Sequence, residues 1–120
     1  MLQLMEECSG NILAIRATGK LTQKDYEEVF YPRFKTSVRK YNKVRTLFYL
    51  DPQFEGWEVE GVFNRFKFIW DCIEAFDKVA LVGGEEWIQK GMTFGAQLMQ
   101  AELKIFNPDE LGRSLEWIKE

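Results

Sequence analysis

Residues 57–73 are apolar on two opposite faces when they are placed on a helix. At about 100° per residue, one face forms the continuous stripe of a helix that packs on a core. That stripe comprises Val59, Val62, Phe63, Phe66, Ile69, Trp70 and Ile73. The opposite face carries Trp57, Gly61, Phe68 and Cys72. Because a domain normally presents charged side chains there, the second apolar face predicts a surface for a ligand, a membrane or a partner.

Short strands and helices alternate along the rest of the chain. β-favouring runs over residues 2–6 and 12–17 flank the turn residues Gly10 and Asn11, a pattern typical of a hairpin. A helix begins at Thr22, because Asp25 lies three positions on, as in a capping box. Pro32 lacks a backbone donor and predicts an irregular turn near residues 28–32 of that helix.

The second half of the chain continues the alternation. Strands are predicted over residues 44–50, 78–82 and 103–106, and helices over 57–73, 85–99 and 108–118. Asn107 is the expected N-cap of the last helix and Pro108 its first residue. The resulting order, ββαβαβαβα, favours an α/β fold. We expect one domain over residues 1–120, with a five-stranded, mostly parallel sheet, an antiparallel opening hairpin and about four helices.

Composition narrows the classes of partner and compartment. The chain is 46% hydrophobic and 29% charged, as is typical of globular proteins. Its formal charge of −3 argues against a nucleic-acid partner. Its Lys and Arg residues are spread along the chain, with acids between them. Cys8 and Cys72 match no disulfide framework or CxxC motif, and no signal peptide or spanning segment is predicted. We expect a cytoplasmic protein with reduced thiols and at most a peripheral contact at the inner face of the membrane.

Candidate catalytic groups are sparse. The chain contains no histidine, the commonest general base and metal ligand. Its densest acidic set is placed by sequence in a loop and at a helix N-terminus, where carboxylates complement the helix dipole. That set comprises Asp51, Glu55, Glu58 and Glu60. Gly83 and Gly84 lack a nucleotide-binding pattern and precede two acids. We therefore expect a protein that is not an enzyme, with no metal and no cofactor.

The helix over residues 85–99 is also apolar over a wide arc. Its inward face is predicted to carry Trp87, Gly91, Phe94 and Leu98. Ile88, Met92 and Met99 extend that face sideways. Flexible methionines beside small residues suit an adaptable apolar guest, although ordinary packing on a sheet would need a similar face.

Several short motifs resemble one known family. They are Gly19-Lys20-Leu21-Thr22, Asp25-Tyr26, residues 51–57, Lys78-Val79-Ala80-Leu81-Val82-Gly83 and Trp87. Together with the order of elements, they resemble the SpoIIAA-like proteins of bacteria. The resemblance implies the STAS fold of anti-sigma factor antagonists and a kinship with the CRAL-TRIO lipid-transfer fold. In the sporulation antagonists, a serine after an aspartate in the segment matching residues 51–57 is phosphorylated. Here that segment contains no Ser or Thr, so no phosphosite is expected.

These observations favour a binding module for an apolar or lipid-like ligand, held beneath a mobile helical lid that also contacts membranes. The expected contact residues are Phe54, Trp57, Phe63, Arg65, Lys67, Phe68, Ile88 and Met92. The flanking Arg65 and Lys67 would suit anionic head groups. One alternative is a protein-partner adaptor that resembles the anti-sigma factor antagonists but works without phosphorylation. Another is a weak homodimer that buries the helix face carrying Trp57 and Phe68. The simplest explanation of the apolar faces is that they pack in the core of the domain.

Overall fold

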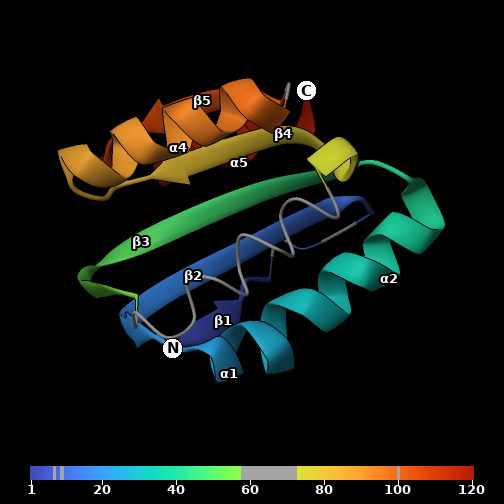
Figure 1. Cartoon of the computed structure of the whole chain (residues 1–120). Coiled ribbons are helices and arrows are strands. Elements are labelled where there is room, and N and C mark those ends of the chain that lie inside the picture. The colour runs from blue at the N-terminus through green and yellow to red at the C-terminus, as the bar shows by residue number, and fades with distance from the viewer. Residues whose placement is uncertain (7, 9, 58–72, 100) are drawn as a thin grey trace.

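A five-stranded sheet organises the computed structural model, which describes residues 1–6, 8, 10–57, 73–99 and 101–120. The strands are β1 (Leu2–Leu4), β2 (Ile12–Leu21), β3 (Val44–Trp57), β4 (Phe76–Val82) and β5 (Glu102–Phe106). They lie side by side in the order of the chain, with β1 antiparallel to β2 and every other pair parallel (Figure 1). The predicted mostly parallel sheet with an opening hairpin is confirmed.

Helices cover both faces of this sheet. The remaining elements are α1 (Gln23–Asp25), the π-helical turn η1 (Tyr26–Phe30), α2 (Tyr31–Tyr41), the 3₁₀ turns η3 (Ile73–Ala75) and η4 (Pro108–Glu110), α4 (Glu86–Met99) and α5 (Leu111–Lys119). One core joins alternate side chains of the strands to η1, α2 and α4. The other joins the intervening side chains to α5. The period of two along each strand therefore separates two hydrophobic layers.

The predicted helix boundaries hold where a capping motif marks them. Asp25 N–H donates to Thr22 Oγ1 at 3.1 Å, and Thr22 N–H donates to Asp25 Oδ2 at 2.9 Å. Asn107 and Glu110 form the same reciprocal pair at η4, and Pro108 follows the cap. The irregular turn expected near Pro32 is the π-helical turn η1, which ends two residues before the proline. η1 runs directly into α2, and Pro32, which lacks a backbone N–H, stands at the start of α2, just after the π-helical turn.

The predicted ends of three strands are wrong. β3 does not end at Leu50 but continues through Trp57, across a segment that the sequence assigns to a loop and a helix start. β4 pairs with β3 only as far as Tyr49, so the extension pairs with β2 alone. Pro52 is tolerated because one side of the extended strand needs no partner, and register shifts near Gly19 absorb the irregularity. β2 lengthens correspondingly to Leu21, whereas β1 stops at Leu4.

The predicted orientation of α4 is also wrong. Ile88 and Ala96 are buried and Met92 is half-buried, whereas Trp87 and Phe94 are 59% and 65% exposed. The helix is therefore turned by about one residue, or about 100°, from the expected position. Apolar residues occupy two adjacent stripes of α4, so periodicity alone does not select the one that packs. The predicted lid consists of the helices over residues 57–73 and 85–99. The first of these lies outside the described residues, apart from Trp57 at the end of β3 and Ile73 at the start of η3, whereas the second is α4.

Candidate functional site

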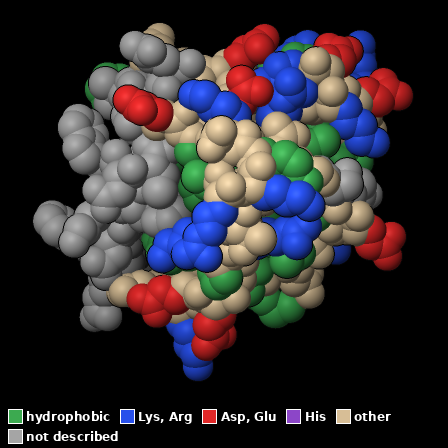
Figure 2. All heavy atoms as spheres, turned by 90° about the vertical axis from the view of Figure 1, so that its right-hand side faces the viewer, with side chains coloured by type: hydrophobic (Ala, Val, Ile, Leu, Met, Phe, Trp, Pro, Cys, Tyr) green, Lys and Arg blue, Asp and Glu red, His purple; other side chains and the backbone are tan. Residues whose placement is uncertain are grey.

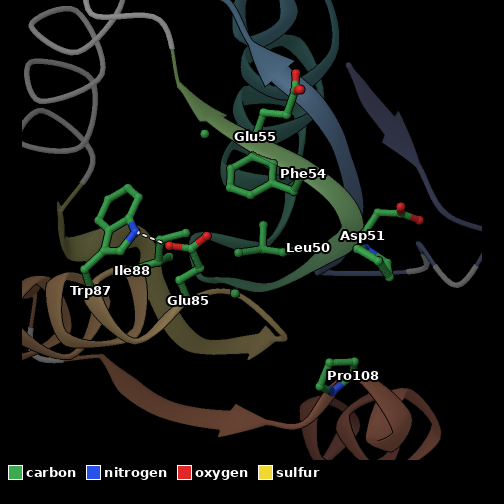
Figure 3. A pocket seen from close by; sticks show the side chains of 11 residues that line it. Leu50, Asp51, Phe54, Glu55, Glu85, Trp87, Ile88 and Pro108 are labelled. Atoms are coloured by element: carbon green, nitrogen blue, oxygen red, sulfur yellow. Dashed lines mark hydrogen bonds between the residues drawn. The ribbon is translucent and has the colours of Figure 1, made fainter.

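A pocket of about 260 Å³ lies at the carboxyl ends of β3 and β4, next to the start of α4 (Figure 3). It is lined by Leu50, Asp51, Pro52, Phe54, Glu55, Gly56, Gly84, Glu85, Trp87, Ile88 and Pro108. In open α/β sheets, ligands bind outside the carboxyl ends of the strands, because the connecting loops and helix starts converge there. The position of the pocket therefore makes it the first candidate for a binding site.

The floor of the pocket is apolar. Leu50 and Ile88 are each 5% exposed, and both side chains belong to the larger core. Gly84 lies against them with a φ of +91°, and a Cβ added there would approach Leu50 Cδ1 to 2.8 Å. Only glycine combines this backbone conformation with so close an approach, so Gly84 keeps the space above Leu50 open.

The rim of the pocket is acidic and aromatic. Trp87 Nε1 donates a 2.8 Å hydrogen bond to Glu85 Oε2, and this carboxylate lies between the indole and Leu50 in Figure 3. Phe54 is half-buried and projects over the floor from β3. Of the eleven described residues that line the pocket, none is Lys, Arg, Ser, Thr or Cys. The described lining thus offers apolar contacts and carboxylate hydrogen-bond acceptors, but no hydroxyl, thiol or amine side chain that could act as a nucleophile.

Asp51 is part of the pocket wall but is occupied by structural contacts. Its Oδ1 accepts a 3.0 Å hydrogen bond from the Gln53 amide, and its Oδ2 accepts from the Arg16 guanidinium. The Gln53 N–H, followed by Arg16, holds the pKa of Asp51 below its ordinary value, although burial opposes the shift. A carboxylate held ionised in this way is a poor proton donor near neutral pH, and it stabilises the bend of β3 after Leu50.

A second, open hollow adjoins the pocket. It is lined by Met1, Thr18, Gly19, Pro52, Gln53, Phe54 and Glu55, with a volume of about 630 Å³. The two cavities share Pro52, Phe54 and Glu55, which form the wall between them. Phe54 is therefore placed to contact an occupant of either cavity.

Two of the residues predicted to bind ligand line the pocket, namely Phe54 and Ile88. Met92 does not; it packs half-buried against the larger core. Trp57 ends β3, but its side chain and residues Phe63, Arg65, Lys67 and Phe68 lie outside what the structure describes. The membrane contact expected of those side chains and the opening of a lid formed by the helices over residues 57–73 and 85–99 therefore stay predictions.

Sequence reasoning did not assign Leu50, Gly84, Glu85 or Trp87 to a site, although it placed Trp87 on the inward face of its helix. A usable signal was present, because both Asp51 and the Gly83-Gly84 pair directly follow predicted parallel strands. The carboxyl ends of such strands meet at one edge of a sheet, so residues that follow them become neighbours.

Within the described ranges, no group of three or more His, Cys, Asp or Glu side chains is arranged to hold a metal ion. None of the described helices has both the length and the apolar character needed to cross a bilayer. Cys8 is a free, half-buried thiol that hydrogen-bonds to the backbone of Ala14, and Cys72 lies outside the described residues.

Comparisons with known proteins agree on the fold. A family model described as SpoIIAA-like matches residues 12–119. The crystal structure of an uncharacterized protein of the DUF3478 family from Shewanella loihica PV-4, with a SpoIIAA-like fold, superimposes with a TM-score of 0.75. The two sequences are 22% identical, and the match covers 98% of this chain and 93% of the other. No curated protein matches the chain significantly.

Proposed function

The chain belongs to the SpoIIAA-like family, and from that membership and the pocket we propose that it is a non-enzymatic binding module for an apolar or lipid-like ligand. The observation that carries the proposal is the apolar floor formed by Leu50 and Ile88 at the carboxyl ends of β3 and β4. Burial of apolar ligand surface there would supply the binding free energy, at about 25 cal/mol per Å².

The size and lining of the pocket restrict its ligand. At about 260 Å³, the pocket falls just below the range of roughly 300–1,000 Å³ that is usual for ligand sites. It would therefore take a small apolar molecule or one end of a longer chain. The described rim carries Glu55 and Glu85, so a neutral ligand is favoured over a carboxylate or phosphate.

The proposal is tested with the neutral fluorophore N-phenyl-1-naphthylamine, whose emission rises in an apolar environment. We expect the purified protein to bind it and a neutral monoacylglycerol to displace it. Phe54→Ala should weaken binding about tenfold or more, because a buried aromatic contact contributes about 1.5–3 kcal/mol. The matched control is Phe48→Ala, on the same strand but outside the pocket lining, and it should retain affinity.

Either of two results would contradict this function. Wild-type protein that binds neither probe nor monoacylglycerol would remove the case for an apolar ligand. Equal loss of affinity in Phe54→Ala and Phe48→Ala, at a temperature where both variants are folded, would place the ligand elsewhere. Titration by calorimetry in parallel separates true binding from a change in probe emission.

A protein-partner adaptor is the second candidate function, and one observation favours it. Phe94 is 65% exposed on the outer face of α4, about two turns beyond the 59% exposed Trp87. Large aromatics on one helix face are typical of protein interfaces. Residues 51–57 contain no Ser or Thr, so this adaptor would work without a phosphorylated side chain in that segment. Sedimentation of wild type and Phe94→Ser at micromolar concentration would reveal whether a second copy is the partner.

A further inference from the structure

The cations of α2 are concentrated on its outer face. Arg33, Lys35, Arg39 and Lys40 are all exposed. Figure 2, which faces the side of the molecule where α2 lies, shows basic side chains distributed among apolar and polar ones, with acidic ones toward the edges of the view. The sequence contains no Asp or Glu between residues 29 and 50. The expectation that cations and acids alternate along the chain is therefore wrong for this helix. Because the formal charge of the whole chain is −3, the remainder of the molecule is acidic, and α2 makes the charge distribution strongly asymmetric.

The opposite face of α2 packs in the hydrophobic core. Phe34 is completely buried and its ring lies 4.9 Å from that of Phe76, while Ser37 is 5% exposed. The helix therefore cannot turn its apolar face toward a membrane without unfolding the domain. Any contact made by α2 must use its charged outer surface, and its strength must depend on salt.

Among the residues that the structure describes, no carboxylate forms an ion pair with the cations of this face, Arg33, Lys35, Arg39 and Lys40. The nearest acids along the chain precede the helix, where Glu28 already pairs with Lys24 at 3.8 Å. At the other end, Lys43 Nζ donates to the main-chain oxygen of Glu74. Four long basic side chains thus remain available to one external anionic surface.

We propose that the outer face of α2 docks the protein on the anionic headgroups of a phospholipid bilayer. From Arg33 to Lys40 the helix rises about 10 Å. At about 100° per residue, Lys35 and Arg39 flank its outer face on one side and Arg33 and Lys40 on the other, and long basic side chains on both flanks can reach a plane that lies along the helix. Tyr41 follows at the helix end, 39% exposed, with Lys40 Nζ 5.4 Å from its ring centroid. A tyrosine beside cations suits the boundary between headgroups and water.

The asymmetry of charge favours a bilayer over a nucleic acid. The molecule measures 32 × 31 × 27 Å, whereas the Debye length at physiological salt is about 8 Å. A flat surface touching α2 is therefore screened from the acids on the far side of the domain. A duplex that followed the protein surface would bring phosphates toward those acids, at a cost in affinity.

Docking through α2 goes beyond the proposed ligand function and can be tested separately. In Figure 1 the carboxyl ends of β3 and β4 point to the left, and α2 lies at the right. The pocket residues are thus not on the basic face, and a bilayer at α2 leaves them uncovered. Loss of vesicle binding need not change binding of a small ligand in the pocket.

The test is co-sedimentation of the purified full chain with vesicles of phosphatidylglycerol and phosphatidylcholine, compared with phosphatidylcholine alone. Arg39→Gln with Lys40→Gln removes two cations of the face. The matched control, Lys20→Gln with Lys119→Gln, removes the same charge from exposed positions on β2 and α5. Each cation near an anionic surface changes affinity about fivefold, so the α2 variant should bind roughly 25-fold more weakly and the control nearly as well as wild type.

Binding should also require anionic lipid and should disappear near 1 M salt, where the Debye length is about 3 Å. The proposal is overturned if wild type ignores anionic vesicles at low salt, or if the α2 variant and the control lose affinity equally. Binding of wild type to duplex DNA but not to vesicles would also overturn it, in favour of a nucleic-acid surface. Thermal unfolding of both variants verifies that they are folded at the assay temperature.

Discussion

Arg16 Nε lies 3.1 Å from Oδ2 of Asp51, and this ion pair joins β2 to β3 across 35 residues of sequence. The Asp51 side chain is only 9% exposed, and its other oxygen accepts the Gln53 N–H. The carboxylate therefore positions the bend from which Pro52 and Phe54 continue into the pocket wall. Residues 51–57 are thus organised by an ion pair and contain no Ser or Thr.

Asp51→Asn should make stability less sensitive to acid. Because contacts hold the folded-state pKa of Asp51 below its ordinary value of about 4, the unfolded chain binds more protons than the folded one around that pH. The stabilisation is thus present above the unfolded pKa and is lost as pH falls through the folded pKa. Denaturant unfolding between about pH 7 and pH 3 should give a shallower acid decline for the variant.

The control for this experiment is Glu116→Gln, which changes an exposed carboxylate of α5. It should reproduce the acid decline of wild type. Glu110 will contribute to that decline in all three proteins, since the Asn107 N–H, followed by Arg113, lowers its pKa. An unchanged slope in Asp51→Asn would show that the ion pair adds nothing to folding.

Gly84→Ala should destabilise the domain and obstruct the pocket. The new Cβ would adopt a φ of +91° and approach Leu50 Cδ1 to 2.8 Å. We expect a loss of about 1–3 kcal/mol in the free energy of unfolding. Gly112→Ala is the matched control in α5, where an added Cβ meets nothing within 4 Å. It should raise stability by about 0.5–1 kcal/mol, so opposite signs in urea titrations are the expected result.

Arg45→Gln should loosen the attachment of α5. Arg45 Nη1 donates a 3.0 Å hydrogen bond to the carbonyl of Ile118, and its Nε lies 3.1 Å from Asp77 Oδ2. The cation also complements the C-terminal end of the helix dipole. The loss should be near the lower end of about 1.5–3 kcal/mol, because the side chain is 21% exposed.

The comparison variant for α5 is Arg113→Gln, whose ion pair with Glu110 is largely exposed on the Arg113 side. Its effect on stability should stay below about 1 kcal/mol. Thermal unfolding monitored by circular dichroism distinguishes the two. Equal melting temperatures would mean that the last turn of α5 is held by packing alone.

Phe94→Ser should leave stability within about 0.5 kcal/mol of wild type, since the side chain is mostly exposed. Ile88→Ser should cost several kcal/mol, because it empties a buried site and introduces a hydroxyl there. Calorimetric melting of the pair tests the orientation of α4 directly. The reverse ranking would restore the orientation predicted from sequence and refute the structure at this helix.

The sequence alone predicted the order of the strands and of the helices that the structure describes, for local reasons. The Thr22 and Asn107 caps, the irregular turn before Pro32 and the β-favouring runs are each specified by a few neighbouring residues. The predicted parallel sheet also followed, because a helix between two strands leaves few other topologies. Family resemblance agreed with this pattern, and the family match over residues 12–119 bears it out.

Only the tertiary structure decided the features that depend on contacts between residues far apart in sequence. The extension of β3 through Trp57 depends on pairing with β2, which no local propensity of a Pro- and Gly-containing segment predicts. The orientation of α4 depends on whether the stripe with Ile88 or the stripe with Trp87 packs on the sheet, and both stripes are apolar in sequence. The pocket needs Leu50 of β3, Gly84 of the β4–α4 connection and Pro108 of η4 brought together. Periodicity measures only local amphipathicity, whereas the sheet pairing and close packing that create a site are long-range.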